Sequence, residues 1–128
     1  MAKKTVSYKD TDTYKRLLIV AHMNRMVLAD EFKFHETRKW RADFALLAKE
    51  PTRYRGIIIE VEGGLWIQGR HNHPVSVQKD LEKYNEAAKY WYLLLRYTPQ
   101  QWKAGKPVDD VKELINAINY PYNGIAER

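Results

Sequence analysis

The spacing of apolar residues along the chain predicts an alternation of helices and strands. A helix capped by Thr11 or Asp12 runs to about residue 28, and its apolar residues cover more than one face. Phenylalanines alternate with charged residues over residues 31–38, which predicts a first strand. Largely apolar runs at residues 40–47 and 56–62 predict two more strands, joined as a hairpin by a loop that contains a proline.

The second half of the chain predicts a helix, a buried strand and a final helix. The helix spans residues 75–90, the uniformly apolar and aromatic strand spans residues 91–97, and the last helix spans residues 108–119. The apolar residues at helical spacing that predict the buried face of the first of these helices are Val77, Leu81, Tyr84 and Ala88. A helix between the third and fourth strands permits a parallel crossover, so we expect an α/β fold whose mixed central sheet has helices on both sides.

Length and composition fit one packed domain that spans residues 1–128. The apolar fraction is 45%, and 22 basic against 16 acidic residues give a formal net charge of +6. Such a charge suits a polyanionic partner, although many small basic proteins only carry solvated lysine and arginine faces. The absence of cysteine excludes disulfides, thiolate zinc sites and a cysteine nucleophile. The N-terminus does not resemble a secretion signal and no apolar run approaches ~20 residues, so we expect a cytoplasmic protein without a membrane segment.

Three carboxylates mark the hairpin as a candidate metal site. Asp43 lies in the otherwise apolar first strand of the hairpin, and Glu60 and Glu62 end its second strand. Because strand side chains alternate between faces, Glu60 and Glu62 share one face about 7 Å apart. Carboxylates on an apolar strand are costly to bury without a cation, and Mg2+ binds such oxygens while it retains waters. Acids at a strand end also often only meet solvent, so the spacing leaves both interpretations open.

Basic residues follow the acidic strand in the chain. We interpret the loop that contains Arg70, His71 and His73 as a phosphate contact, because its two histidines lack further zinc ligands at a suitable spacing. Lys79 and Lys83 lie one turn apart on the predicted helix and can project together. An ordinary exposed loop and solvated lysines are the alternatives.

The arrangement of these motifs resembles a known nuclease superfamily. The order α-β-β-β-α-β, with an aspartate on the second strand and Glu-x-Glu on the third, is similar to that of the PD-(D/E)XK, or restriction-endonuclease-like, superfamily. The runs that look like small nuclease-like proteins of phages and prophages are FHETRKWRADFALL, IIIEVEGGLWIQGRH, DLEKYNEAA and WYLLLRYT. The resemblance covers about residues 31–98 and implies a restriction-endonuclease-like fold, with the last helix added to its core.

The resemblance assigns roles to the acids residue by residue. Asp43 matches the metal-binding aspartate and Glu60 matches its acidic partner, with the backbone carbonyl of Val61 as a further metal ligand. Glu62 stands where the superfamily most often has lysine. In this position Glu62 would bind the metal or orient the attacking water, as a second ligand or a general base.

The departure at Glu62 leaves the usual lysine role to another residue. Lys79 or Lys83 would supply it from the following helix, and Glu31 resembles a metal-binding acid that several members contribute upstream of the core. The residues expected to contact DNA are Arg41, Arg70, His71, His73, Lys79 and Lys83.

The resemblance implies a DNA endonuclease that depends on Mg2+, for which Mn2+ would substitute. We expect it to select branched DNA, as a Holliday-junction resolvase does, or DNA ends, in phage recombination or genome processing within the bacterial cytoplasm. Two cuts in a symmetric junction would require a two-fold homodimer. The alternative is a catalytically inactive DNA-binding or regulatory module, which the missing motif lysine favours and the retained acids disfavour. A sugar- or nucleotide-binding protein built around Trp66 is a weaker alternative, because no phosphate-cradling glycine loop is found.

Overall fold

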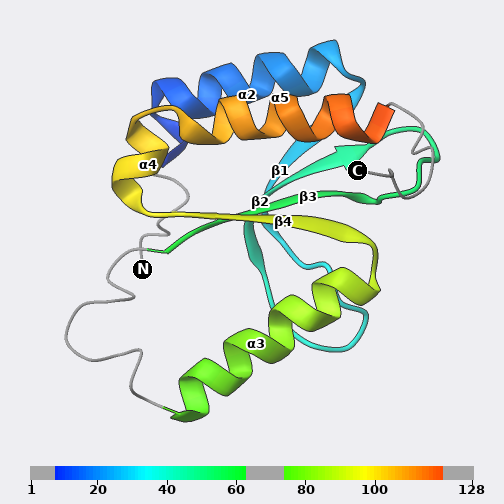
Figure 1. Cartoon of the computed structure of the whole chain (residues 1–128), viewed down its shortest axis with the longest axis vertical. Helices are drawn as coiled ribbons and strands as arrows, with labels where there is room; N and C mark the ends of the chain where they lie inside the picture. The colour runs from blue at the N-terminus through cyan, green and yellow to red at the C-terminus, as the bar shows by residue number, and fades with distance from the viewer. Residues whose placement is uncertain (1–7, 63–73, 120–128) are drawn as a thin grey trace, which may run out of the picture.

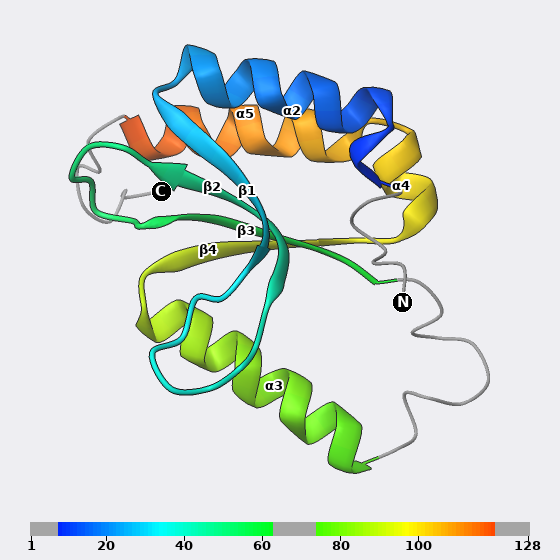
Figure 2. The same ribbon diagram turned by 180° about the vertical axis from the view of Figure 1, so that it is seen from behind.

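The chain forms three layers, with a four-stranded sheet between two layers of helices (Figure 1). The computed structural model describes residues 8–62 and 74–119. The strands are β1 (Met26–Phe32), β2 (Ala42–Ala48), β3 (Gly56–Val61) and β4 (Tyr92–Tyr97). The helices α2 (Asp12–Met23), α4 (Pro99–Lys103) and α5 (Lys106–Asn119) lie on one side of the sheet, and α3 (Pro74–Lys89) lies on the other (Figure 2).

The strand order across the sheet, β1-β2-β3-β4, follows the order along the chain. β2 is antiparallel to both β1 and β3, whereas β4 runs parallel to β3 and is reached through α3. A parallel pair needs such a crossover, while antiparallel neighbours need only short connections. The structure therefore confirms the predicted α/β class, the hairpin of β2 and β3, and the mixed sheet with helices on both faces.

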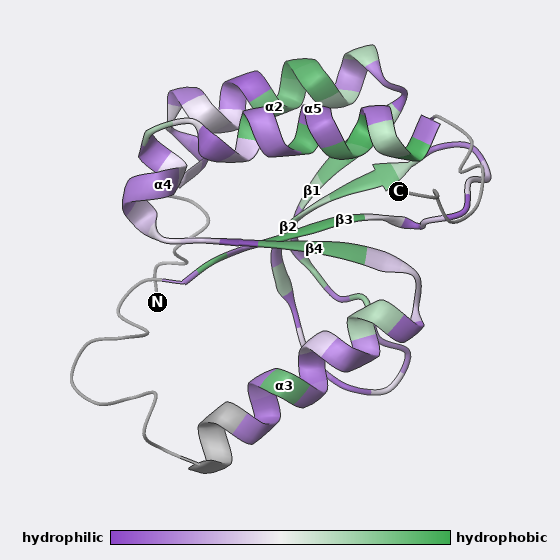
Figure 3. Ribbon diagram, viewed as in Figure 1, coloured by the Kyte–Doolittle hydropathy of each residue, from purple (hydrophilic) through white to green (hydrophobic). Residues whose placement is uncertain are grey.

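The two faces of the sheet bury different side chains. The face toward α2 and α5 carries the larger core, because alternate residues of β2 and β3 meet apolar residues of these helices. Members of this core are Leu17, Phe44, Leu46, Ile57, Ile59, Trp102, Val108 and Val111. The smaller core on the face toward α3 consists of Phe34, Ala42, Ile58, Ala87 and Tyr92. Figure 3 shows that the strands are mainly hydrophobic, while the coloured part of α3 is mostly hydrophilic.

The first helix ends earlier than its apolar pattern predicts. Thr11 caps α2 as expected, since its side chain accepts a bond from the N–H of Tyr14. The helix stops at Met23, and Asn24 closes it with N–H bonds to carbonyls of the last turn. Arg25 then adopts the left-handed conformation, with φ of 54°, and turns the chain directly into β1. Residues 26–28, predicted as helix, therefore belong to a strand.

The strand predicted at residues 31–38 is wrong beyond Phe32, where β1 ends. The following segment is a loop organised by His35, whose Nδ1 accepts N–H bonds from Thr37 at 3.2 Å and Arg38 at 3.0 Å. These local bonds satisfy backbone donors that a strand would have paired with its neighbour. Phe34 is buried against the smaller core, so the alternation of apolar residues reflects a packed loop.

The remaining elements lie close to their predicted positions. β2, β3, α3 and β4 differ from the predicted ranges by only one or two residues at their ends. The short helix α4 was not predicted; Thr98 and Gln101 form a capping box at its start, with Pro99 in the first turn. α5 begins at Lys106, slightly before the predicted start. Within the described ranges, no helix is long and apolar enough to cross a membrane.

Candidate functional site

A row of charged residues crosses the sheet near the C-terminal ends of β3 and β4. Glu60 of β3 pairs with Arg96 of β4 in the parallel ladder. The antiparallel register that pairs Phe44 with Ile59 places Asp43 opposite Glu60 at the next position. Because residues opposite one another in neighbouring strands share a face, the sheet brings Asp43, Glu60 and Arg96 together. They lie on the side of the sheet that α3 covers.

Asp43 is a buried carboxylate at the point where β2 separates from β3. Asp43 is only 5% exposed, and its Oδ2 accepts a hydrogen bond from the backbone N–H of Val61 at 2.8 Å. The last ladder pair at this end is Phe44 with Ile59, so the carboxylate takes the place of a strand carbonyl. The predicted metal ligands Asp43 and Val61 are thus in direct contact, with the Val61 side chain in the larger core.

Glu60 is equally buried and is paired with a lysine from α3. The Nζ atom of Lys83 lies 2.5 Å from Oε1 of Glu60 and also donates to the carbonyl of Arg41 at 2.8 Å. The Lys83 side chain is 17% exposed and that of Glu60 is 7% exposed, so water screens the pair little. Of the two predicted lysines, the structure brings Lys83 to the acids, whereas Lys79 is exposed.

Glu62 is held on both of its carboxylate oxygens. The hydroxyl of Tyr84 on α3 donates to Oε1, and Nε of Arg96 donates to Oε2 at 2.7 Å. The Arg96 guanidinium also lies over the Tyr84 ring, 4.4 Å from its centroid. Burial and the bond to Glu62 raise the pKa of Tyr84 well above its usual value, so this hydroxyl remains a donor at neutral pH. Glu60 and Glu62 both contact α3, in agreement with their predicted common face.

The face of α3 toward the sheet combines the buried Ala87 with polar side chains, which the apolar spacing did not predict. Leu81, placed inward by the periodicity, is 58% exposed, and Ala88 is exposed as well. Tyr84 faces the sheet as predicted, and Lys83 faces it as well, because the sheet offers these two side chains Glu62 and Glu60 as partners. Tyr84 and Arg96 are site residues that sequence reasoning missed. The one available signal was Arg96 itself, a charge inside an otherwise apolar and aromatic strand.

The loop between β1 and β2 is fastened to α3 beside these acids. Nε2 of His35 lies 3.0 Å from Oε1 of Glu86, and Arg38 bonds Glu82 at 2.5 Å. Because Nδ1 of His35 accepts backbone N–H bonds, its Nε2 carries the proton and donates to Glu86. The loop thereby holds the Arg41 carbonyl within reach of Lys83, and the Arg41 residue is exposed.

Glu31 occupies an unusual backbone position near Asp43. The ladder pairs Asp30 with Phe44 and Phe32 with Ala42, which leaves Glu31 opposite Asp43. Glu31 has φ of 48°, a conformation that non-glycine residues seldom adopt within a strand. Such conformations persist where surrounding structure imposes them and are frequent at functional sites. The register thus extends the acidic row to the edge strand, in keeping with the upstream acid that the resemblance implies.

The structure brings two buried acids together, Asp43 and Glu60, without a third acidic ligand among the described residues. Among residues 8–62 and 74–119, no three histidine, aspartate or glutamate side chains are arranged so that they could hold a metal by themselves. Mg2+ usually binds through only one or two carboxylates, together with waters and substrate phosphates. The pair Asp43 and Glu60 therefore suits an ion that shares its ligands with a phosphate. The predicted loop residues Arg70, His71 and His73 lie outside the described residues.

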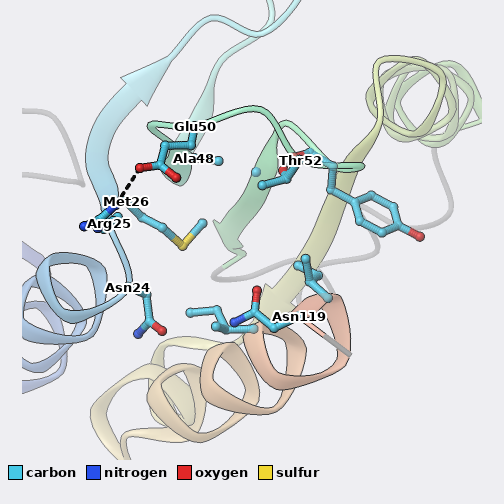
Figure 4. A pocket seen from close by; sticks show the side chains of 11 residues that line it. Asn24, Arg25, Met26, Ala48, Glu50, Thr52 and Asn119 are labelled. Atoms are coloured by element: carbon cyan, nitrogen blue, oxygen red, sulfur yellow. Dashed lines mark hydrogen bonds and ion pairs between the residues drawn. The ribbon is translucent and has the colours of Figure 1, made fainter. Parts of the chain in front are cut away.

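A cavity of about 170 Å³ lies at the opposite end of the sheet (Figure 4). Its walls come from the turn after α2, the loop between β2 and β3, and the end of α5. Lining residues include Asn24, Arg25, Met26, Thr52, Ile115 and Asn119. Its one carboxylate, Glu50, is bonded to Arg25 at 2.7 Å, as Figure 4 shows. The cavity therefore has no share in the acidic row.

Comparisons with protein-family models, with curated proteins and with solved structures find no significant match for this chain. Assignment of a function therefore rests on the residues and on the geometry described above.

Proposed function

We propose that the protein is a metal-dependent DNA endonuclease of the PD-(D/E)XK type. The observation that carries the proposal is the meeting of two buried carboxylates, Asp43 and Glu60, with the ammonium of Lys83. Buried charges contribute little net stability, so clustering them at one end of a sheet favours a functional role. The order α2-β1-β2-β3-α3-β4 supports the same type, because it agrees with the α-β-β-β-α-β order of the resemblance.

Asp43 and Glu60 would hold Mg2+, with the Val61 carbonyl as a further oxygen donor, whereas Glu31 is not arranged with them as a third acidic ligand in the described part of the chain. Mn2+ would substitute, because it accepts the same oxygen ligands. When bound, the ion neutralises phosphate oxygens and activates water for attack on the diester. Asp43 is anchored to β3 by the Val61 N–H, so its position is set before any substrate arrives.

Glu62 and Lys83 supply the remaining charges that hydrolysis requires. A bond forms between a water oxygen and phosphorus, the bond from phosphorus to the leaving sugar oxygen breaks, and solvent protonates that oxygen. Glu62 orients the water and takes its proton; a carboxylate has about four acceptor sites, so the bonds from Tyr84 and Arg96 do not exhaust it. Lys83 turns from Glu60 to the phosphate and offsets the charge that develops there.

Glu62→Gln should lower the cleavage rate about 100-fold and leave DNA affinity unchanged, because glutamine accepts hydrogen bonds but no proton. The rate is measured in single turnovers with Mg2+, and the affinity is measured with Ca2+ in its place. Tyr84→Phe, which removes one bond to Glu62, should cause a smaller loss of rate. A rate for Glu62→Gln that recovers at high Mg2+ would make Glu62 a metal ligand, and an unchanged rate would remove it from the site.

The proposal is tested by incubating the protein with linear, nicked, flapped and four-way DNA in Mg2+, Mn2+ or EDTA. We expect cleavage of at least one branched form that requires the metal and is lost in Asp43→Asn. Four-way junctions would be cut by a two-fold homodimer, which sedimentation with and without junction DNA would detect. Absence of cleavage on every form with either metal would overturn the proposal. Recombination or genome processing by a phage, in the bacterial cytoplasm, is the setting that this activity fits.

A DNA-binding module without cleavage is the second candidate, and one observation favours it. Lys83 and the Val61 N–H already compensate Glu60 and Asp43 within the protein. A basic chain with a net charge of +6 would still bind DNA through its lysines and arginines. Binding that is insensitive to EDTA, together with no cleavage, would support this candidate.

A further inference from the structure

An exposed tryptophan lies at the end of the sheet opposite the acidic row. Trp91 joins α3 to β4 and is 55% exposed. Its φ of 65° is left-handed, a conformation in which helix ends usually place glycine. The backbone explains why the position is ordered: the Trp91 N–H bonds Ala88, and its carbonyl accepts the Arg55 N–H at 2.8 Å. Both bonds are made by the backbone, so neither needs a tryptophan side chain. A side chain that is largely exposed also contributes little to the stability of the fold.

Other π faces and a guanidinium group adjoin this tryptophan. The Tyr54 ring centroid lies 6.0 Å from that of Trp91, with the planes tilted by 57°. The Arg55 guanidinium lies over Tyr90, 5.6 Å from its ring centroid. Aromatic faces and arginine planes on a protein surface are the groups on which unpaired bases stack.

The charges around Trp91 are mainly positive. The loop between β2 and β3 presents the exposed residues Lys49, Arg53 and Arg55, and the end of α3 adds Lys89, whose side chain is 70% exposed. Of the nearby acids, Glu50 bonds Arg25 and Glu86 bonds Lys89 and His35. Lys89 is therefore itself paired, and the excess of positive charge comes from Lys49, Arg53 and Arg55. This charge complements a phosphate backbone, and the exposed aromatic ring beside it suits a base, so the two together favour nucleic acid over a purely apolar or an acidic protein surface.

We propose that this surface binds single-stranded nucleic acid by stacking a base on Trp91. We call it the Trp91 platform; it consists of Tyr54, Arg55 and Trp91 with Lys49, Arg53 and Lys89. The platform requires no metal and does not rest on the proposed cleavage. Gly56 pairs with Tyr92 beside the platform, and Glu60 pairs with Arg96 at the acids, four residues further along β3. Four residues of a strand span about 13 Å, so one strand of nucleic acid can contact both the Trp91 platform and the acids. If the protein is a nuclease, its substrate then carries a single-stranded segment.

The test measures the affinity of the wild type and of variants for a fluorescently labelled oligothymidylate of twelve nucleotides, in EDTA at low salt. Trp91→Gly should weaken binding about tenfold or more, because stacking on one aromatic ring is lost. Glycine suits the left-handed backbone at this position, so the variant should unfold at the same or a higher temperature. Leu81→Ala, which removes another exposed apolar side chain from the same side of the sheet, should bind as the wild type does. Arg55→Ala should reduce the slope of log affinity against log salt by about one.

Three outcomes would overturn the proposal: no oligothymidylate binding by the wild type, unchanged affinity in folded Trp91→Gly, or equal losses in Trp91→Gly and Leu81→Ala. A wild-type dimer that dissociates in Trp91→Gly, with unchanged oligothymidylate affinity, would instead identify a second copy of the chain as the partner. The two proposals fail separately, because oligothymidylate binding is measured in EDTA, where no metal-dependent cleavage takes place, and cleavage is measured in its own assay with Mg2+ or Mn2+.

Discussion

Glu60→Gln should reduce metal-dependent DNA cleavage by about 1,000-fold or more, and Asp43→Asn should do the same. Each change keeps the size of the side chain and removes the charge that would hold the metal. Each also keeps an oxygen that can accept the existing bond, from Lys83 in one case and from the Val61 N–H in the other. We therefore expect the fold to survive while the rate is lost, as measured by single-turnover cleavage at saturating DNA.

Glu113→Gln is the matched control for these two variants. Glu113 is an exposed glutamate on α5, on the opposite side of the sheet, so the same loss of charge there should leave the rate unchanged. Thermal unfolding shows whether each variant is folded before its rate is compared. If a folded Asp43→Asn or Glu60→Gln protein cleaved DNA at the wild-type rate, the result would contradict the proposed site.

The acidic pair could be predicted from the sequence because two local signals coincide. An aspartate inside an apolar strand and a glutamate at the end of the next strand are visible without tertiary information. A hairpin also restricts how two strands pair, so a predicted β2–β3 hairpin already brings Asp43 and Glu60 to the same end. The fold class followed from similar reasoning, since a helix between strands implies a parallel crossover.

The partners of these acids could not be predicted, because apolar periodicity assumes an apolar neighbour. On α3 the pattern placed Leu81 and Tyr84 inward, but the sheet presents Glu60 and Glu62 there, so Lys83 faces the sheet beside Tyr84 while Leu81 is exposed. Nothing in the chain order distinguishes Lys79 from Lys83, because the two project from one face of the helix; which of them meets the acids depends on where the helix lies along the sheet. The early end of α2 was missed for a related reason, since the apolar residues after Met23 continue as the alternation of β1.

Lys83→Met should destabilise the metal-free protein and make it respond more strongly to metal. In the structure the Lys83 ammonium lies 2.5 Å from Oε1 of Glu60, where Mg2+ would have to bind. Methionine keeps much of the side-chain volume but removes that charge, and breaking a buried pair costs about 3 kcal/mol of the free energy of unfolding. A divalent ion can then compensate the acids without displacing a lysine, so it should restore much of this stability.

Thermal unfolding in EDTA and across a series of Mn2+ concentrations measures this response without any reference to catalysis. We expect Mn2+ to raise the unfolding temperature of Lys83→Met more than that of the wild type, and at lower concentration. Lys79→Met, which removes an exposed lysine one turn earlier on α3, should respond to Mn2+ as the wild type does. In cleavage assays Lys83→Met should still lose about 100-fold in rate, because no ammonium is left to offset charge on the phosphate. Equal Mn2+ responses in all three proteins would mean that Lys83 does not occupy the position of a metal ion.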